Sequence, residues 1–305
     1  MKRRPASILY ISFMLAAPLA AQTTTIGGGT CNSGSLNGTY SVSITGRQVT
    51  SATAASATYK NVFQANGSAT FDGLSTVSIS LMADTNQAVG TSLTWSGTYS
   101  VQANCAGVMN ITTGDSATLN LAIYDGGVDF LVSGSDASYA YAGSGIAQPA
   151  GCLASTFSGV YTLTGTGFAL NGSAVSGAED GTGLVQFDGL GNVTVNITMS
   201  TVGAAATALT LTGTYAVSSS CLGSATLTDA SANAYAMSFS IYNSKVSTTA
   251  FYATLAQNSK FLIAGSGHAI FGQPTADALY REPGSIRKRG ICATPVCGAQ
   301  RGNQA

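Results

Sequence analysis

Hydrophobic and polar residues alternate with a period of two along most of the chain. In the segment 40–44, Tyr40, Val42 and Ile44 are separated by serines. Successive side chains of a β-strand point to opposite faces, so this spacing puts the apolar residues on a buried face and the serines in water. The same alternation recurs in segments 77–81, 119–123, 128–132, 161–163, 193–199, 209–211 and 237–241. No window of about eleven residues has the spacing of an amphipathic helix, so the chain is predicted to be all-β.

Turn-forming pairs of residues lie between these segments. They are Asp72-Gly73, Asp188-Gly189, Gly191-Asn192, Asn66-Gly67 and Asp125-Gly126. Such pairs supply the positive φ that tight hairpin turns require. The spacing predicts about eight strands in each half of the chain, joined by short turns. It favours two tandem antiparallel β-barrels, because closure leaves no exposed sheet edge. Two β-sandwiches are the alternative.

The chain contains an internal repeat. The matching segments are Cys31–Tyr40 with Cys152–Tyr161 (offset 121), Phe71–Leu74 with Phe187–Leu190 (offset 116), Gly97–Cys105 with Gly213–Cys221 (offset 116) and Ala142–Gly145 with Ala264–Gly267 (offset 122). Small changes in the offset are the expected result of differences in loop length. We therefore predict two β-barrel repeats over 31–151 and 152–274, each of ordinary domain size.

Residues 1–21 have the features of a signal peptide. A basic start, Lys2 to Arg4, precedes an apolar stretch over 8–19. That stretch is shorter than the roughly 20 residues of a membrane-spanning helix. We therefore expect a bacterial protein that is secreted or periplasmic and has no transmembrane segment. A linker is expected over 22–30 and a basic, disordered tail over 275–305.

Charge and the scarcity of reactive side chains narrow the functional classes. Charged residues make up 8% of the chain, and residues 22–272 contain 4 basic residues against 10 acidic ones. Nucleic-acid binding is not expected, because it requires cations that neutralise phosphates. His268 is the only histidine, and Ile146 takes the matching position of the first repeat, so no Ser–His or Cys–His dyad is expected. The sequence predicts no metal site, no cofactor and no catalytic residue.

Six cysteines in a chain predicted to be exported indicate disulfides. The repeat narrows the pairings, because two cysteines of the first repeat match two of the second. Pairing within each repeat uses one geometry twice, and the two remaining cysteines lie close together in the tail. The predicted disulfides are Cys31–Cys105, Cys152–Cys221 and Cys292–Cys297.

Aromatic residues of the first repeat provide a candidate ligand site. In a barrel they would line the mouth and accept a small apolar molecule or a sugar. The alternative is that they simply fill the core. The candidate lining residues are Tyr59, Phe63, Trp95, Tyr99, Phe130, Tyr139 and Tyr141.

Four short motifs carry a family resemblance: C-x(4)-L-x-G-x-Y, F-D-G, G-T-Y-x-V-x(3)-C and G-S-G. Together they resemble tandem repeats in secreted proteins of soil bacteria without an assigned activity. The chain is more distantly similar to the calycin superfamily, the lipocalin and avidin barrels, whose first strand begins with Gly-x-Trp. Here Tyr40 and Tyr161 stand in place of that tryptophan, and the only tryptophan, Trp95, is matched by Leu211. The resemblance implies a barrel, but avidin's aromatic biotin box does not carry over.

Besides an adhesin built of β-sandwich domains, which requires long Greek-key crossovers and exposed loop tips, three functional hypotheses follow from these observations. The first is a non-enzymatic secreted β-barrel protein that acts in binding or as a cell-surface or matrix component. The second is a calycin-like carrier of a small hydrophobic ligand, which requires an apolar cavity in each barrel. The third is a cavity-type enzyme such as a cyclase, which requires a buried carboxylate or tyrosine at matched positions of both repeats.

Overall fold

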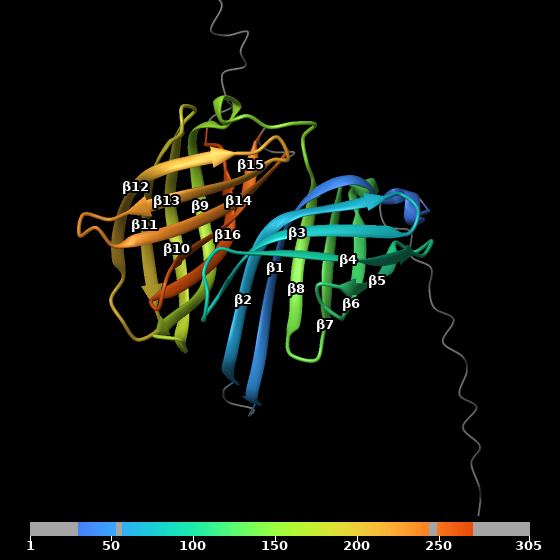
Figure 1. Ribbon diagram of the computed structural model, residues 1–305, viewed down its shortest axis with the longest axis horizontal. Coiled ribbons are helices and arrows are strands. Elements are labelled where there is room, and N and C mark those ends of the chain that lie inside the picture. The colour runs from blue at the N-terminus through green and yellow to red at the C-terminus, as the bar shows by residue number, and fades with distance from the viewer. Residues whose placement is uncertain (1–29, 53–56, 244–248, 271–305) are drawn as a thin grey trace, which may run out of the picture.

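The computed structural model describes residues 30–52, 57–243 and 249–270. They form sixteen β-strands and three short 3₁₀ segments, and no α-helix occurs among them (Figure 1). The strands of the first repeat are β1 (Asn37–Ala52), β2 (Ala57–Asp72), β3 (Thr76–Thr85), β4 (Thr91–Val101), β5 (Ala106–Thr113), β6 (Ala117–Tyr124), β7 (Asp129–Ser135) and β8 (Ala140–Ala147). Those of the second are β9 (Ser158–Asn171), β10 (Ala174–Asp188), β11 (Asn192–Thr201), β12 (Thr207–Val217), β13 (Leu222–Thr228), β14 (Ala234–Tyr242), β15 (Ala250–Gln257) and β16 (Phe261–His268).

Each repeat closes into its own eight-stranded antiparallel barrel. Consecutive strands pair as a meander, and the ring closes where β1 pairs with β8 and where β9 pairs with β16. Closure confirms the predicted barrels and rules out the sandwich alternative. Every strand thus has two neighbours, so neither sheet has a free edge.

The period-two pattern determines which side chains enter each barrel. On β3, Val77, Ile79 and Leu81 are buried, whereas Ser78 and Ser80 between them are exposed. The pleat of the strand sends alternate side chains to opposite faces. The predicted inward-facing residues therefore form two separate apolar clusters, one within each barrel.

The matched Asp-Gly pairs form turns as predicted. The Oδ1 atom of Asp72 accepts hydrogen bonds from the backbone N–H groups of Leu74, Ser75 and Thr76 at 2.8–2.9 Å. Gly73 follows with φ of 76°, a conformation that favours glycine. Asp188 repeats the arrangement in the second barrel. These carboxylates have a structural role because they hold the turns.

The turn predicted at Asn66-Gly67 is wrong. Both residues lie in the middle of β2, where Gly67 pairs with Val42 on one side and Leu81 on the other. A Cβ atom on Gly67 would lie 2.0 Å from the carbonyl oxygen of Ser80. Glycine at this position therefore permits close approach of two strands rather than a reversal of the chain.

One end of each barrel is capped by its own N-terminal segment. The caps are the 3₁₀ segments η1 (Ser33–Ser35) and η3 (Ala154–Thr156). The disulfides Cys31–Cys105 and Cys152–Cys221 tie them to the barrels with Cα–Cα distances of 4.9 and 5.0 Å, which confirms two predicted pairings. The predicted signal peptide, most of the linker, the tail and Cys292–Cys297 lie outside the described residues.

A matched tyrosine locks each cap in place. The hydroxyl of Tyr99 donates to the carbonyl oxygens of Ser33 and Leu36, both at 2.9 Å. In the second barrel the hydroxyl of Tyr215 lies 3.1 Å from the carbonyl oxygen of Ala154 and 2.9 Å from that of Phe157. The tyrosine of the repeated Gly-Thr-Tyr motif therefore attaches the cap to the barrel.

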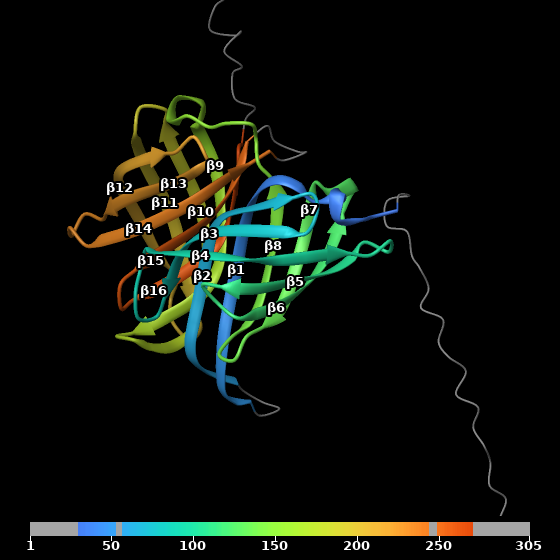
Figure 2. The same cartoon turned by 45° about the vertical axis from the view of Figure 1, so that its right-hand side comes forward.

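The two barrels pack side by side (Figures 1 and 2). β1 and β2 continue past the points where they leave β8 and β3, and they contact β14, β15 and β16 of the second barrel. β2 also contacts β10. We call this contact region the junction. Within the described ranges, no helix is long and apolar enough to span a bilayer.

Candidate functional site

The structure divides the seven candidate aromatic residues among three places. Tyr99 and Phe130 lie at the capped end of the first barrel. Phe63, Trp95, Tyr139 and Tyr141 gather at the opposite end, where the rings of Phe63 and Trp95 stack at a centroid distance of 6.0 Å. Tyr59 lies outside the barrel, at the junction, against Phe168.

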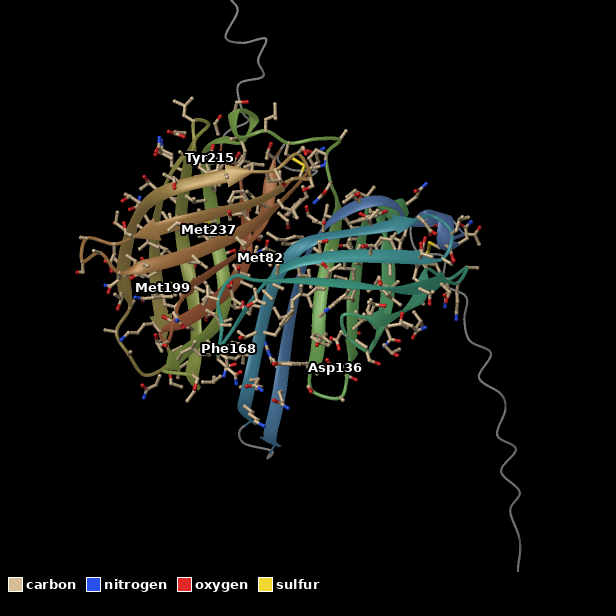
Figure 3. All side chains as sticks on the ribbon, in the orientation of Figure 1. Met82, Asp136, Phe168, Met199, Tyr215 and Met237 are labelled. Atoms are coloured by element: carbon tan, nitrogen blue, oxygen red, sulfur yellow. A yellow bond between two sulfur atoms is a disulfide. The ribbon has the colours of Figure 1, made fainter. Side chains whose placement is uncertain are left out.

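Interlocking rings fill the interiors of both barrels. Trp95 is 2% exposed and Phe239 is completely buried. In the second barrel, Phe239 packs against Phe157, Phe187 and Phe251 at centroid distances of 5.3–6.0 Å. Figure 3 shows Tyr215 and Met199 toward opposite ends of this barrel, with side chains throughout the space between the strands. Of the four cavities described below, none lies inside a barrel.

The closing Gly-Ser-Gly motif makes room for these rings. A Cβ atom on Gly145 would lie 2.3 Å from the ring of Phe130, and one on Gly267 would lie 2.2 Å from the ring of Phe251. Neither position accepts a side chain without moving an aromatic ring. The matched glycines are therefore part of the core packing.

Two carboxylates meet a phenol at the uncapped end of the first barrel. The hydroxyl of Tyr141 lies 2.6 Å from Oδ2 of Asp136 and 3.0 Å from Oδ2 of Asp115 (Asp136 in Figure 3). Burial and the two carboxylates raise the pKa of Tyr141 well above its usual value, so it remains a neutral donor. Although burial opposes ionisation, hydrogen bonds from Tyr141 and the backbone hold the pKa of Asp136 below its usual value. The cluster thus links the β5–β6 and β7–β8 turns.

The second barrel has different polar groups at the same end. Its inward-facing carboxylate is Glu179, which accepts a hydrogen bond from Thr201 at 3.1 Å and whose pKa is raised by burial. At the repeat offsets, Phe63 takes the position of Glu179, and Ile263 takes the position of Tyr141. Glu179 and Tyr141 are therefore not matched between the repeats, whereas the matched buried tyrosines Tyr99 and Tyr215 donate to the carbonyl oxygens of the caps.

The described residues contain no group of three or more His, Cys, Asp or Glu side chains that could hold a metal ion. His268 is exposed at the end of β16, with its ring 6.4 Å from that of Tyr242.

Polar side chains of the first barrel are buried at the junction. Asn66 donates from Nδ2 to the carbonyl oxygen of Ser238 at 2.9 Å and to its hydroxyl at 2.8 Å. Ser41 donates to the carbonyl oxygen of Ile241 at 2.5 Å. Asn86 donates to the carbonyl oxygen of Ser173 at 2.6 Å. These bonds fix the register of one barrel against the other, because a shift would leave buried donors without partners.

Asp84 is also buried at the junction. It is 2% exposed and accepts a hydrogen bond from the backbone of Gly90 at 2.7 Å. Burial raises the pKa of Asp84, and a hydrogen bond with Thr254 of the second barrel partly opposes that effect. No ion pair to Asp84 occurs in the part of the chain that the structure describes. Its charge therefore opposes junction formation.

An apolar cluster and a cation lie at the edge of the junction. Val62, Phe168 and Leu170 are buried together with residues of β15 and β16, and Tyr59 packs against them. The guanidinium of Arg47 lies 5.9 Å from the ring centre of Tyr59 and 5.6 Å from that of Phe168. This geometry is a cation–π contact. Phe168 is seen beside β2 in Figure 3.

Two adjoining cavities, of about 610 and 440 Å³, open along this side of the junction. They share Thr45, Thr166 and Asp180 and therefore form one continuous site, which we call the junction groove. Each is within the size range of ligand pockets, roughly 300–1,000 Å³. Its polar and aromatic lining consists of Ser43, Thr45, Arg47, Tyr59, Gln64 and Ser144 from the first barrel and Thr164, Thr166, Phe168, Ser176, Asp180, Thr182, Tyr252 and Ser266 from the second.

Matched positions of the two repeats line the junction groove. The offsets of the repeat relate Ser43 to Thr164, Thr45 to Thr166, Gln64 to Asp180 and Ser144 to Ser266. The groove thus presents two related sets of hydroxyl groups, one from each barrel.

Two other cavities are less suited to a specific ligand. One, of about 540 Å³, lies between the barrels and is lined by apolar groups such as Met82, Leu93 and Val217 (Met82 in Figure 3). The other, of about 510 Å³, lies on the outer surface of the first barrel near Asp72 and Thr76. Neither contains a cation.

The sequence interpretation missed the junction. A signal for it exists in the segments Phe251–Ala256 and Phe261–Ala264, which are nearly continuous apolar runs. Such runs are typical of strands that are buried on both faces. No comparable signal marks Gln64 or Asn66, because a polar residue on the outer face of a strand normally faces water.

No protein-family model matches the chain, and no curated protein matches it significantly. The two closed barrels are consistent with a calycin-like architecture.

Proposed function

We propose that this protein is an exported, non-enzymatic binding protein whose ligand occupies the junction groove. The observation that carries the proposal is where the open space lies. The barrel interiors are packed with rings, whereas a cavity of about 610 Å³ is formed by both barrels together. A ligand in this groove would contact residues that the fold holds in place on rigid strands.

Two alternatives receive less support from the same geometry. A carrier of a small hydrophobic ligand needs an apolar cavity in each barrel, and buried side chains such as Trp95 and Phe239 take up that space. A cavity-type enzyme needs equivalent reactive groups that face a cavity in the two repeats. Glu179 is matched by Phe63, and the matched hydroxyls of Tyr99 and Tyr215 donate to cap carbonyls instead.

Export is supported by the chemistry of the cysteines. Two disulfides join described residues, and such bonds persist mainly in oxidising compartments. Secretion or transfer to the periplasm is therefore part of the proposal, together with the predicted signal peptide.

Crystals soaked separately with xenon and with a small polyol would test the location of the site. Xenon enters dry apolar cavities, whereas a polyol seeks hydrogen-bonding groups. We expect the polyol in the junction groove and no xenon inside either barrel. Xenon bound inside both barrels, together with no polyol bound in the junction groove, would overturn the proposal in favour of the hydrophobic carrier.

A further inference from the structure

We propose that the junction groove binds a neutral, linear saccharide chain. This inference rests on the proposed function and specifies the class of ligand. It combines four features of the described residues: a row of hydroxyl groups, a guanidinium without an ion pair beside two aromatic rings, a buried amide oxygen without a partner, and the doubling of the lining by the repeat.

The hydroxyl groups suit a ligand that both donates and accepts hydrogen bonds. Thr164 and Thr166 are exposed on the groove, and Ser144 shares a hydrogen bond with Tyr252 at 2.9 Å. Burial raises the pKa of Tyr252 to about 12, so its phenol remains neutral at physiological pH. Each of these side chains combines a donor with acceptor lone pairs, as sugar hydroxyls do. An aliphatic ligand would offer no partner to the hydroxyl groups of Thr164 and Thr166.

Arg47 provides the most directional donors in the groove. It is exposed and forms no ion pair with any described residue. Its planar guanidinium has five N–H donors, which can contact two adjacent hydroxyl groups at once. The rings of Tyr59 and Phe168 lie beside it. A pyranose ring carries apolar C–H faces and polar edges, so a mixed aromatic and guanidinium surface complements it.

Charge favours a neutral ligand over an acidic one. Asp180 lines both cavities and is exposed. Its carboxylate accepts hydrogen bonds from hydroxyl groups and offsets the positive charge of Arg47, so the lining has no net positive charge to attract a polyanion. The excess of acidic residues over 22–272 acts in the same direction. We therefore assign a neutral saccharide rather than a polyuronate.

Gln64 supplies a buried acceptor in the wall of the groove. Its side chain is 2% exposed, and its Nε2 donates to the carbonyl oxygen of Thr166 at 3.3 Å. Its Oε1 is buried without a hydrogen-bond partner among the described residues. An unpaired buried acceptor is costly, and a small movement of the Gln64 amide toward the groove would let a ligand hydroxyl beside Thr166 donate to it.

The matched lining indicates a ligand that itself repeats. Thr45 and Ser144 of the first barrel have their counterparts, Thr166 and Ser266, in the same groove. The two adjoining cavities continue past this shared region toward Phe168. A polymer of similar sugar units meets related hydroxyl sets in succession, which a single small molecule does not.

Affinity electrophoresis of the full chain in gels that contain soluble polysaccharides tests the inference. The probes are hydroxyethylcellulose, galactomannan, xyloglucan and dextran as neutral polymers, and polygalacturonate as the acidic comparator. We expect at least one neutral polymer to retard the protein and polygalacturonate to have no effect. Retardation by polygalacturonate alone, or by no polymer, would overturn the assignment of a neutral saccharide. The location of the ligand site would then still be tested by the xenon and polyol experiment.

Two variants locate the binding. Thr166→Trp places a large ring where the cavities meet, and Arg47→Gln removes the guanidinium. We expect each to weaken retardation at least roughly tenfold, the effect of losing charged hydrogen bonds or space in a ligand site. The matched controls are Thr226→Trp, on an exposed outer face away from the groove, and Lys260→Gln, which removes one positive charge elsewhere.

Thermal unfolding of every variant separates loss of binding from loss of fold. Variants that melt with the parent protein but no longer bind support the assignment. Undiminished binding by both Thr166→Trp and Arg47→Gln would overturn the groove as the site, and with it the proposed function.

Discussion

The barrel interiors and the junction are both buried, yet they are held by different forces. In the second barrel, Phe239 is surrounded by other aromatic rings, and its contacts are apolar. At the junction, Asn66 and Ser41 bury hydrogen-bonding groups against Ser238 and Ile241. Apolar burial supplies stability without strong direction, whereas buried hydrogen bonds tolerate little displacement. The difference indicates that the interiors determine whether each barrel folds and the junction determines how the barrels are oriented.

The largest effect should come from emptying an interior. Phe239→Ala removes a completely buried ring from the centre of the aromatic cluster, and we expect the free energy of unfolding to fall by about 3–5 kcal/mol. Urea denaturation followed by tyrosine fluorescence measures the change. Leu190→Ala is the matched control, because Leu190 is 87% exposed and its truncation should change stability by less than about 0.5 kcal/mol. Equal losses in the two variants would contradict the distinction between interior and surface.

An intermediate effect is expected at the junction. Asn66→Ala removes two hydrogen bonds to Ser238 and leaves the buried carbonyl oxygen with fewer donors. We expect a loss of about 1–3 kcal/mol. A double-mutant cycle with Ser238→Ala should give a coupling energy on the order of 1 kcal/mol. Asn110→Ala on the exposed face of β5 is the control. If the effects of Asn66→Ala and Ser238→Ala on the free energy of unfolding are additive, the junction is held by its apolar cluster rather than by the hydrogen bonds between these two residues.

The smallest effect should be a gain in stability. Burial raises the pKa of Asp84 in the folded chain. The folded chain is therefore not destabilised by this group below its unfolded pKa, near 3.8, where the carboxyl group is protonated in both states. The free energy of unfolding falls as the pH rises from there through the folded pKa. Asp84→Asn removes the charge and should raise the free energy of unfolding at pH 7 by roughly 1 kcal/mol.

The pH dependence gives this prediction its control. At pH 3, where the carboxyl group is protonated in both states, the Asp84→Asn variant and the parent protein should be equally stable. Thermal unfolding across pH 3–7 checks the difference. A variant that is less stable than its parent at pH 7 would show that the carboxylate has a favourable partner at the junction.

The barrels were predictable because the sequence patterns that specify them are local and occur in both repeats. Alternation at Val77, Ile79 and Leu81 specifies an inward face, and the two copies of each cysteine remove most pairings. The junction was not predictable in the same way. A glutamine such as Gln64 has the same place in the alternation whether water or another barrel covers it.

The aromatic site was only partly predictable, because the sequence does not state the end of the barrel at which a residue lies. Trp95 and Tyr99 both point inward from β4. At about 3.3 Å per residue they are about 13 Å apart along the strand. One therefore packs near the uncapped end and the other holds the cap. The groove residue Tyr59 was among the candidates, whereas Arg47 and Gln64 were not, because their role depends on the second barrel.

Pairing of the first strand with the last has a consequence for how such chains grow. In each barrel the chain enters and leaves on neighbouring strands at the same rim, as the pairing of Tyr40 with Ala147 shows. A further copy added at that rim would interrupt no ladder of an existing barrel. Tandem multiplication is thus geometrically simple for this fold, and each added unit creates a new interface on which selection can act.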